Sequence, residues 1–199
     1  MAQPIDSAQT LIPPPAYQAK LDELAVELYT LAAMLVGEGE SSAQLAVTAV
    51  ETSEVSACEN PIAARKSARR TLCRTALAQI AAANPATLAA PAATATVQSC
   101  IADDELEAAG VSADELQAML SGPERDRVRN WLEQLSTPVR TVFVLRAVAG
   151  YCANDTAAML AEFGGPQATG WTPKAASDTF RQGLCSLASQ LLHASTAKA

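Results

Sequence analysis

Leucine recurs near the N-terminus at a spacing that an α-helix satisfies and a strand does not. The five leucines lie three, four, three and four residues apart, at Leu21, Leu24, Leu28, Leu31 and Leu35. A helix places all of them on one face, whereas a strand would divide them between two faces. Alanine, the strongest helix former, contributes much of the 49% apolar content. Because no run alternates polar residues with β-branched apolar ones, the sequence predicts an all-α protein.

Proline, glycine and capping residues mark the ends of the first three predicted helices. A run of prolines at 13–15 opens the helix that carries the leucines, and Gly37 ends it. Ser41 and Gln44 match a capping box for a second helix. Asn60-Pro61 is a cap followed by a first-turn proline, so it opens a third helix, which ends near residue 83.

The next part of the chain reads as a linker between two helical domains. Residues 84–101 are rich in Ala, Thr and Pro and carry no charge, which is typical of a mobile connection. We therefore expect an N-terminal domain over 13–83, a linker over 84–111 and a C-terminal domain over 112–195. Later helices are predicted over 103–107, 112–120, 124–135, 138–149, 154–163 and 173–193.

The chain is acidic, and its charge is uneven. Residues 1–121 hold 15 acidic and 6 basic side chains, and residues 122–199 hold 6 acidic and 8 basic ones. Because phosphates repel an acidic chain, we expect any nucleic-acid contact from local patches, mainly in the C-terminal part. No stretch reaches about 18 uninterrupted apolar residues, and the start of the chain lacks the features of a signal peptide. These features predict a cytoplasmic protein with no membrane partner.

Nothing in the sequence argues for catalysis. His193 is the single histidine, so a histidine pair for a metal is absent. No glycine-rich phosphate loop follows a strand. The five cysteines form no CxxC pair, and we expect them to be buried thiols on helix faces: Cys58, Cys73, Cys100, Cys152 and Cys185. The sequence therefore predicts a protein that is not an enzyme and needs no metal and no cofactor.

The C-terminal third, from Trp131 to Leu192, has the order of a helix–turn–helix unit. Its entry is Leu-Ser-Thr-Pro at 135–138, followed by the apolar helix Val-Phe-Val-Leu-Arg at 142–146. Asp-Thr-Ala at 155–157 starts the next helix, and Thr-Pro-Lys at 172–174 opens a long amphipathic one. This order resembles the C-terminal, promoter-binding domain of the small extracytoplasmic-function sigma factors.

A weaker resemblance to the same family covers the N-terminal part. The helix at Leu21–Leu35, the turn at 37–40 and the stretch Ala-Gln-Leu-Ala-Val at 43–47 resemble the family's first polymerase-binding helix, its turn and the start of its next helix. The resemblance implies a transcription regulator whose partners are core RNA polymerase and promoter DNA, with a regulatory protein as a further candidate partner.

The resemblance also implies which residues meet those partners. It places Lys174, Ser177 and Arg181 toward DNA, with Arg140 and Arg146 as phosphate contacts. The polar face of the first helix is the candidate surface for polymerase or another partner, and it consists of Asp22, Glu23 and Glu27.

The chain departs from the family where the family carries DNA-reading chemistry. Ala176 and Thr179 stand where the family usually has basic side chains, and Asp178 adds a negative charge. No aromatic residue lies between Tyr29 and Trp131, although aromatic platforms are what capture unstacked bases. The turn at 164–171 is also longer than a tight three- or four-residue turn.

A basic patch on the third helix has two interpretations. It contains Arg65, Lys66, Arg69, Arg70 and Arg74. In one, it is a strip that follows a DNA backbone or an acidic protein surface. In the other, it is a solvated face that counters the acidic first helix.

Three functional hypotheses follow from these features. The first is a sigma-like transcription regulator that acts through RNA polymerase and promoter DNA, with its DNA binding either intact or weakened. The second is a protein-interaction adaptor on a sigma-like scaffold that binds no DNA. The third, a regulator that responds to a small molecule, ranks last because the sequence shows no polar constellation for a ligand.

Overall fold

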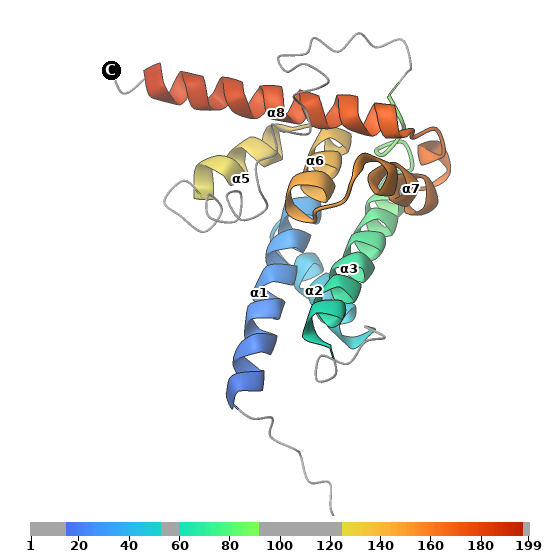
Figure 1. Ribbon diagram of the computed structural model, residues 1–199. Helices are drawn as coiled ribbons and strands as arrows, with labels where there is room; N and C mark the ends of the chain where they lie inside the picture. The colour runs from blue at the N-terminus through green and yellow to red at the C-terminus, as the bar shows by residue number, and fades with distance from the viewer. Residues whose placement is uncertain (1–14, 53–59, 92–124, 197–199) are drawn as a thin grey trace, which may run out of the picture.

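The computed structural model describes residues 15–52, 60–91 and 125–196, and these residues form helices and no strand (Figure 1). The predicted all-α fold is confirmed. The helices are α1 (Pro15–Val36), α2 (Glu40–Glu51), α3 (Pro61–Ala83), α5 (Arg125–Gln134), α6 (Thr137–Phe143), α7 (Ala153–Phe163) and α8 (Pro173–Thr196). The helices predicted over 103–107 and 112–120 lie outside the described residues. None of the described helices combines the length and apolar character that crossing a membrane requires.

Short irregular turns connect the C-terminal helices. A π-helical turn, Val144–Val148, continues α6, and a 3₁₀ turn, Pro166–Ala168, precedes α8. In Figure 1, α1, α2 and α3 run alongside one another and α8 crosses above them, with α6 and α7 in between. Both α6 and α7 pack on α8, while α7 also contacts α3 and the π-turn contacts α1.

The end of the first predicted helix and both ends of the third are confirmed, whereas the predicted start of the second is wrong. Gly37 follows the end of α1 with a φ of 92°, a conformation that glycine adopts without strain. The Asn60 side chain accepts a hydrogen bond from the backbone N–H of Ala63 at 3.0 Å, and so caps α3. The capping box of Ser41 and Gln44 is wrong, because α2 begins earlier and the Ser42 hydroxyl bonds to the Gly39 backbone instead.

One cluster of buried side chains joins the N-terminal helices to the C-terminal ones. Leu28 of α1, Leu72 of α3 and Leu145 of the π-turn are each 0% exposed and belong to it. Burying one leucine contributes about 2 kcal/mol, so the leucine face of α1 is a main source of stability. The core between these helices fixes the orientation of α1 and α3 relative to α6–α8.

Three aromatic rings hold α5, α6 and α8 together. The Phe143 ring meets Trp131 edge to face at 5.0 Å and lies 5.7 Å from Phe180 between ring centroids. Gly183 lets α8 approach closely, because a Cβ there would lie 2.9 Å from Cδ2 of Phe143. The indole N–H of Trp131 donates to the Ser186 hydroxyl at 3.0 Å.

The segment predicted as the start of a mobile linker is held in place where the structure describes it. Leu88 is 0% exposed, and its carbonyl accepts a hydrogen bond from the Trp171 indole N–H at 2.8 Å. Trp171 and the buried Ala168 come from the long turn before α8. That turn therefore packs against residues 84–91, a contact that composition alone did not predict.

The cysteines do not share one environment. Cys73 is buried and free, as expected. The expectation is wrong for Cys152, which is exposed and accepts a hydrogen bond from the Asp155 backbone N–H at the start of α7. It is also wrong for Cys185, which is disulfide-bonded. Cys58 and Cys100 lie outside the described residues.

Candidate functional site

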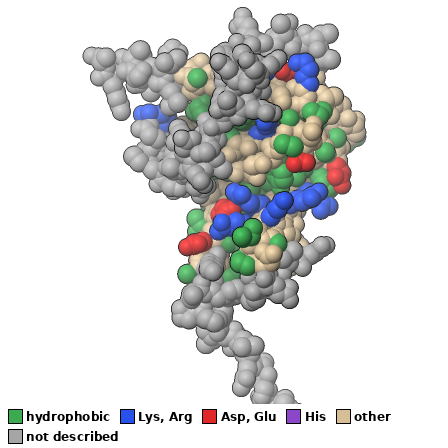
Figure 2. Space-filling model, in the orientation of Figure 1, with side chains coloured by type: hydrophobic (Ala, Val, Ile, Leu, Met, Phe, Trp, Pro, Cys, Tyr) green, Lys and Arg blue, Asp and Glu red, His purple; other side chains and the backbone are tan. Residues whose placement is uncertain are grey.

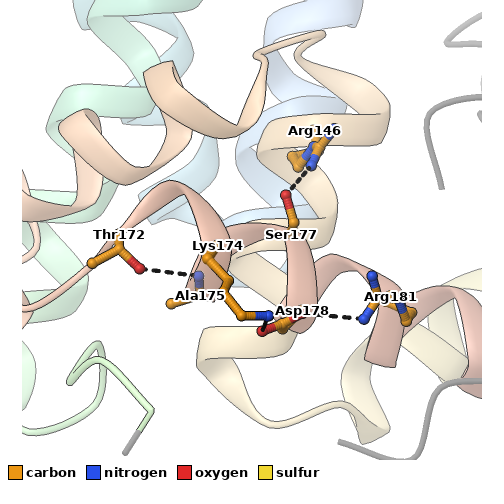
Figure 3. Close-up of polar contacts among 7 residues, drawn as sticks. All are labelled: Arg146, Thr172, Lys174, Ala175, Ser177, Asp178 and Arg181. Carbon is orange, nitrogen blue, oxygen red and sulfur yellow. Dashed lines mark hydrogen bonds and ion pairs between the residues drawn. The ribbon is translucent and has the colours of Figure 1, made fainter. Parts of the chain in front are cut away.

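Two surfaces carry the residues that the sequence singled out, and the first is the start of α8. Asp178 accepts from Lys174 Nζ at 3.0 Å and from Arg181 Nη1 at 3.1 Å (Figure 3). The Lys174 side chain is 80% exposed, whereas that of Arg181 is 8% exposed. One carboxylate thus holds both basic side chains of this face, and one of the two is removed from solvent.

The predicted DNA contacts Ser177 and Arg146 meet each other. Arg146 Nη1 donates to the Ser177 hydroxyl at 3.4 Å (Figure 3). The Arg146 guanidinium also lies 4.6 Å from the centroid of the Phe180 ring. Both side chains are half-buried between the π-turn and α8. Their contacts join these two elements, in addition to any role toward a ligand.

Arg140 lies on α6 and is half-buried against α1. It lines a small cavity of about 60 Å³ together with Tyr29, Met34 and Arg129. Burial lowers the pKa of the Arg140 guanidinium, and the nearby Glu133 opposes that shift. Among the five side chains predicted to contact DNA, Lys174 is the one that the structure leaves exposed.

The second surface is α3, where the structure divides the basic patch in two. Arg65 Nε lies 3.2 Å and Arg69 Nε lies 2.7 Å from the carboxylate oxygens of Glu27 on α1. Arg69 also donates to the carbonyl of Val148 at 3.2 Å. These two arginines therefore connect α3 to α1 and to the π-turn, which agrees with the interpretation of the patch as a counter to the acidic helix.

The other three basic residues, Lys66, Arg70 and Arg74, lie on a different side of α3. All three are exposed and line a groove of about 760 Å³, which we call the α3 groove. Among the described residues, its other lining residues come from α3 itself, from Thr52 after α2 and from Phe163 at the end of α7. Figure 2 shows Lys and Arg side chains gathered in a band across this face of the molecule.

Within the described part of the chain, no carboxylate forms an ion pair with these three cations. The Arg74 guanidinium lies 4.5 Å from the centroid of the Phe163 ring, which holds it at one end of the groove. The sequence analysis treated all five basic residues as one patch. Their spacing nevertheless indicates two groups. Residues 66, 70 and 74 recur every fourth position, while 65 and 69 are offset by one.

Only part of the candidate partner surface on α1 is exposed to a binding partner. Asp22 and Glu23 are exposed, whereas Glu27 is engaged by Arg65 and Arg69, and its side chain is 17% exposed. Glu27 therefore serves the packing of α1 against α3, and the exposed acidic part of this face lies nearer the start of the helix.

The described residues contain no cluster of three His, Cys, Asp or Glu side chains that could hold a metal ion. The buried thiol of Cys73 is a poor nucleophile, because burial raises its pKa to about 12. No protein-family model matches the chain, and no curated protein or solved structure matches it either.

Proposed function

We propose that this chain is a non-catalytic, sigma-like transcription regulator that acts mainly through a protein partner, core RNA polymerase. In this proposal α7 and α8 form a helix–turn–helix in which α8 reads promoter bases weakly. The sigma-like layout has an N-terminal domain over 13–83 and a C-terminal domain over 112–195. The proposal thus combines the weak DNA binding of the first hypothesis with the protein-mediated action of the second.

The observation that carries the proposal is the pairing of Asp178 with both Lys174 and Arg181. Guanine edges and phosphates are bound by free Arg and Lys side chains. Arg181 would have to leave a buried ion pair before it could reach DNA, and Lys174 would share its charge with Asp178. Both requirements reduce the free energy available for promoter binding.

The candidate surface for polymerase is the exposed acidic start of α1, represented by Glu23. An acidic helix face speeds association with a basic surface and selects against acidic ones. The net charge of −7 favours a basic protein surface over the phosphate backbone as the partner.

Two measurements with the full chain test the proposal. The first is binding to purified core RNA polymerase, for which we expect a complex that Glu23→Lys weakens several-fold. Glu51→Lys, on the exposed end of α2, is the matched control and should bind like the unchanged protein. Loss of the complex with both variants, or no complex at all, would contradict the proposed partner surface.

The second measurement is binding to promoter-containing DNA fragments between about 50 and about 200 mM salt. We expect weak binding without preference for a promoter, which disappears as salt rises. Tight, sequence-specific binding at the higher salt would show that α8 reads promoters directly, and the proposed adaptor-like action would then be wrong.

A further inference from the structure

The α3 groove has the features of an anion site, and its cations are regularly spaced. Lys66, Arg70 and Arg74 are separated by one helical turn each, so successive side chains start about 6 Å apart along the helix. The groove volume of about 760 Å³ lies within the usual range of small-molecule sites. Three positive charges therefore face one concave space of ligand size.

The contrast with the neighbouring arginines argues against a purely structural role for these cations. Arg65 and Arg69, on the same helix, have Glu27 as their counterion. Within the described residues, Lys66, Arg70 and Arg74 have no carboxylate partner. Placing three like charges on one helix face costs free energy, and an anionic ligand would remove that cost.

The floor of the groove suits phosphate oxygens. Ala63, Ser67 and Thr71 are small residues that lie beside the cations, so a ligand can come close to the helix. The hydroxyls of Ser67 and Thr71 add hydrogen-bond donors. Arginine binds phosphates through paired N–H groups and lysine through a compact charge, and the groove offers both.

The charge of the protein outside the groove favours a short ligand. The chain carries a net charge of −7, so a long polyanion that extended beyond the three cations would be repelled by the rest of the protein. A compact anion with several charges would instead stay among the three cations.

We propose that the α3 groove binds a small polyphosphate, either inorganic or the phosphate chain of a nucleotide. Lys66 and Arg70 bind its phosphate oxygens, and Arg74, held over Phe163, closes one end. The inference goes beyond the proposed function because it assigns a ligand to α3, whereas the proposed polymerase and promoter contacts lie on α1 and α8. It makes the third hypothesis, regulation by a small molecule, testable on named residues.

The test is calorimetric titration of the full chain at low salt, with inorganic tripolyphosphate and adenosine triphosphate as the probes. We expect binding that weakens as salt rises, and that Arg70→Gln weakens about tenfold or more. Arg65→Gln is the matched control, because it removes one arginine of the same helix outside the groove. It should change the affinity less than about twofold. Both substituted side chains are exposed, and circular dichroism checks that each variant stays folded.

The outcomes of this titration distinguish a nucleotide from an inorganic polyphosphate, and they also distinguish both from other kinds of anion. Tighter binding of adenosine triphosphate than of tripolyphosphate supports a nucleotide, and equal or tighter binding of tripolyphosphate supports an inorganic ligand. The proposal is overturned if neither probe binds, or if Arg65→Gln weakens binding as much as Arg70→Gln does. It is also overturned if a single-stranded oligonucleotide or a glutamate-rich peptide binds the groove and tripolyphosphate does not displace it. The assay contains no polymerase, so its failure would leave the proposed function standing.

Discussion

Arg181, a predicted DNA contact, lies buried on α8 and donates to Asp178 across 3.1 Å, one turn earlier on the same helix. The pair places a positive charge inside the protein and supplies its counterion locally. Lys174 shares the same carboxylate from the solvent side. One carboxylate therefore pairs with both basic side chains near the start of α8, and this pairing predicts how the helix responds when the carboxylate is removed.

The substitution Asp178→Asn should lower stability and raise nonspecific DNA binding. Arg181 would lose its charge-assisted hydrogen bond to Asp178, which costs about 1–3 kcal/mol, while Lys174 would be released toward solvent. Chemical denaturation measures the first effect, and DNA binding at low salt measures the second. Asp155→Asn, an exposed acid on α7, makes the same charge change and is the control. Equal stability of the two variants would contradict the buried pair.

Gly183→Ala tests the crossing of α8 over α6. Alanine is a better helix former than glycine by about 1 kcal/mol, so an exposed position would gain stability. Here the new Cβ would lie 2.9 Å from Phe143 Cδ2, and overpacking of a core costs about 1–3 kcal/mol. We expect thermal denaturation to show that Gly183→Ala is less stable than the unchanged protein. Gln182→Ala, at the neighbouring exposed position, should change the stability very little. A stabilised Gly183→Ala variant would show that the two helices do not pack closely there.

Trp171→Phe tests the attachment of residues 84–91 to the long turn. The substitution keeps most of the apolar contact and removes the indole N–H, so the buried carbonyl of Leu88 loses its donor. An unsatisfied buried acceptor costs about 1–3 kcal/mol. Trp131→Phe removes a bond to a half-buried hydroxyl, which can turn to another partner, and should cost less. Urea denaturation of both variants gives the comparison, and the reverse order would count against this attachment.

Glu27→Gln tests the structural half of the basic patch. Glu27 holds Arg65 and Arg69, and its side chain is 17% exposed, so loss of its charge should cost about 1–3 kcal/mol. Glu23→Gln, four residues earlier and exposed, should stay within about 0.5 kcal/mol of the unchanged protein. If both variants were equally stable in chemical denaturation, Glu27 would be a solvated side chain and not the counterion of Arg65 and Arg69.

The buried thiol of Cys73 predicts a loss of stability in alkaline solution. Burial raises its pKa in the folded protein from 9.0 to about 12, so the folded state binds the proton more tightly than the unfolded chain does. The resulting stability is fully present below about pH 9 and is lost as pH rises toward about 12. In denaturation experiments, the free energy of unfolding of Cys73→Ala should fall less steeply above about pH 9 than that of the unchanged protein. Cys152→Ser, which alters an exposed thiol, should fall as steeply as the unchanged protein. Identical profiles for the two variants would contradict the role of Cys73.

Local signals predicted the helices well, because each depends on a few neighbouring residues. Asn60-Pro61 starts α3 through a side-chain cap, and Gly37 follows the end of α1. The capping box of Ser41 and Gln44 is wrong because α2 begins at Glu40, so that Ser42 is its third residue and bonds to the backbone of Gly39. The composition of residues 84–91 predicts a free linker, because it carries no sign of Trp171, the partner of Leu88, which lies far away in the sequence.

For the candidate site, the sequence supplied the residue types and the tertiary structure supplied their partners. The spacing of Lys66, Arg70 and Arg74 is a property of the sequence, and any α-helix will align them. Whether a charge is free or paired depends on side chains from other elements. Only packing of α3 against α1 placed Glu27 beside Arg65 and Arg69, and only packing against α7 placed Phe163 beside Arg74.

The sequence by itself determined the helical class, most helix ends and the apolar face of α1, because these follow from periodicity and local hydrogen bonding. It did not determine which basic residues face solvent. Arg181 and Lys174 are three and four residues from Asp178, yet one is buried and the other exposed. That difference arises from the way α8 packs on α6, since burial is a property of the whole fold and not of a residue's neighbours in the chain.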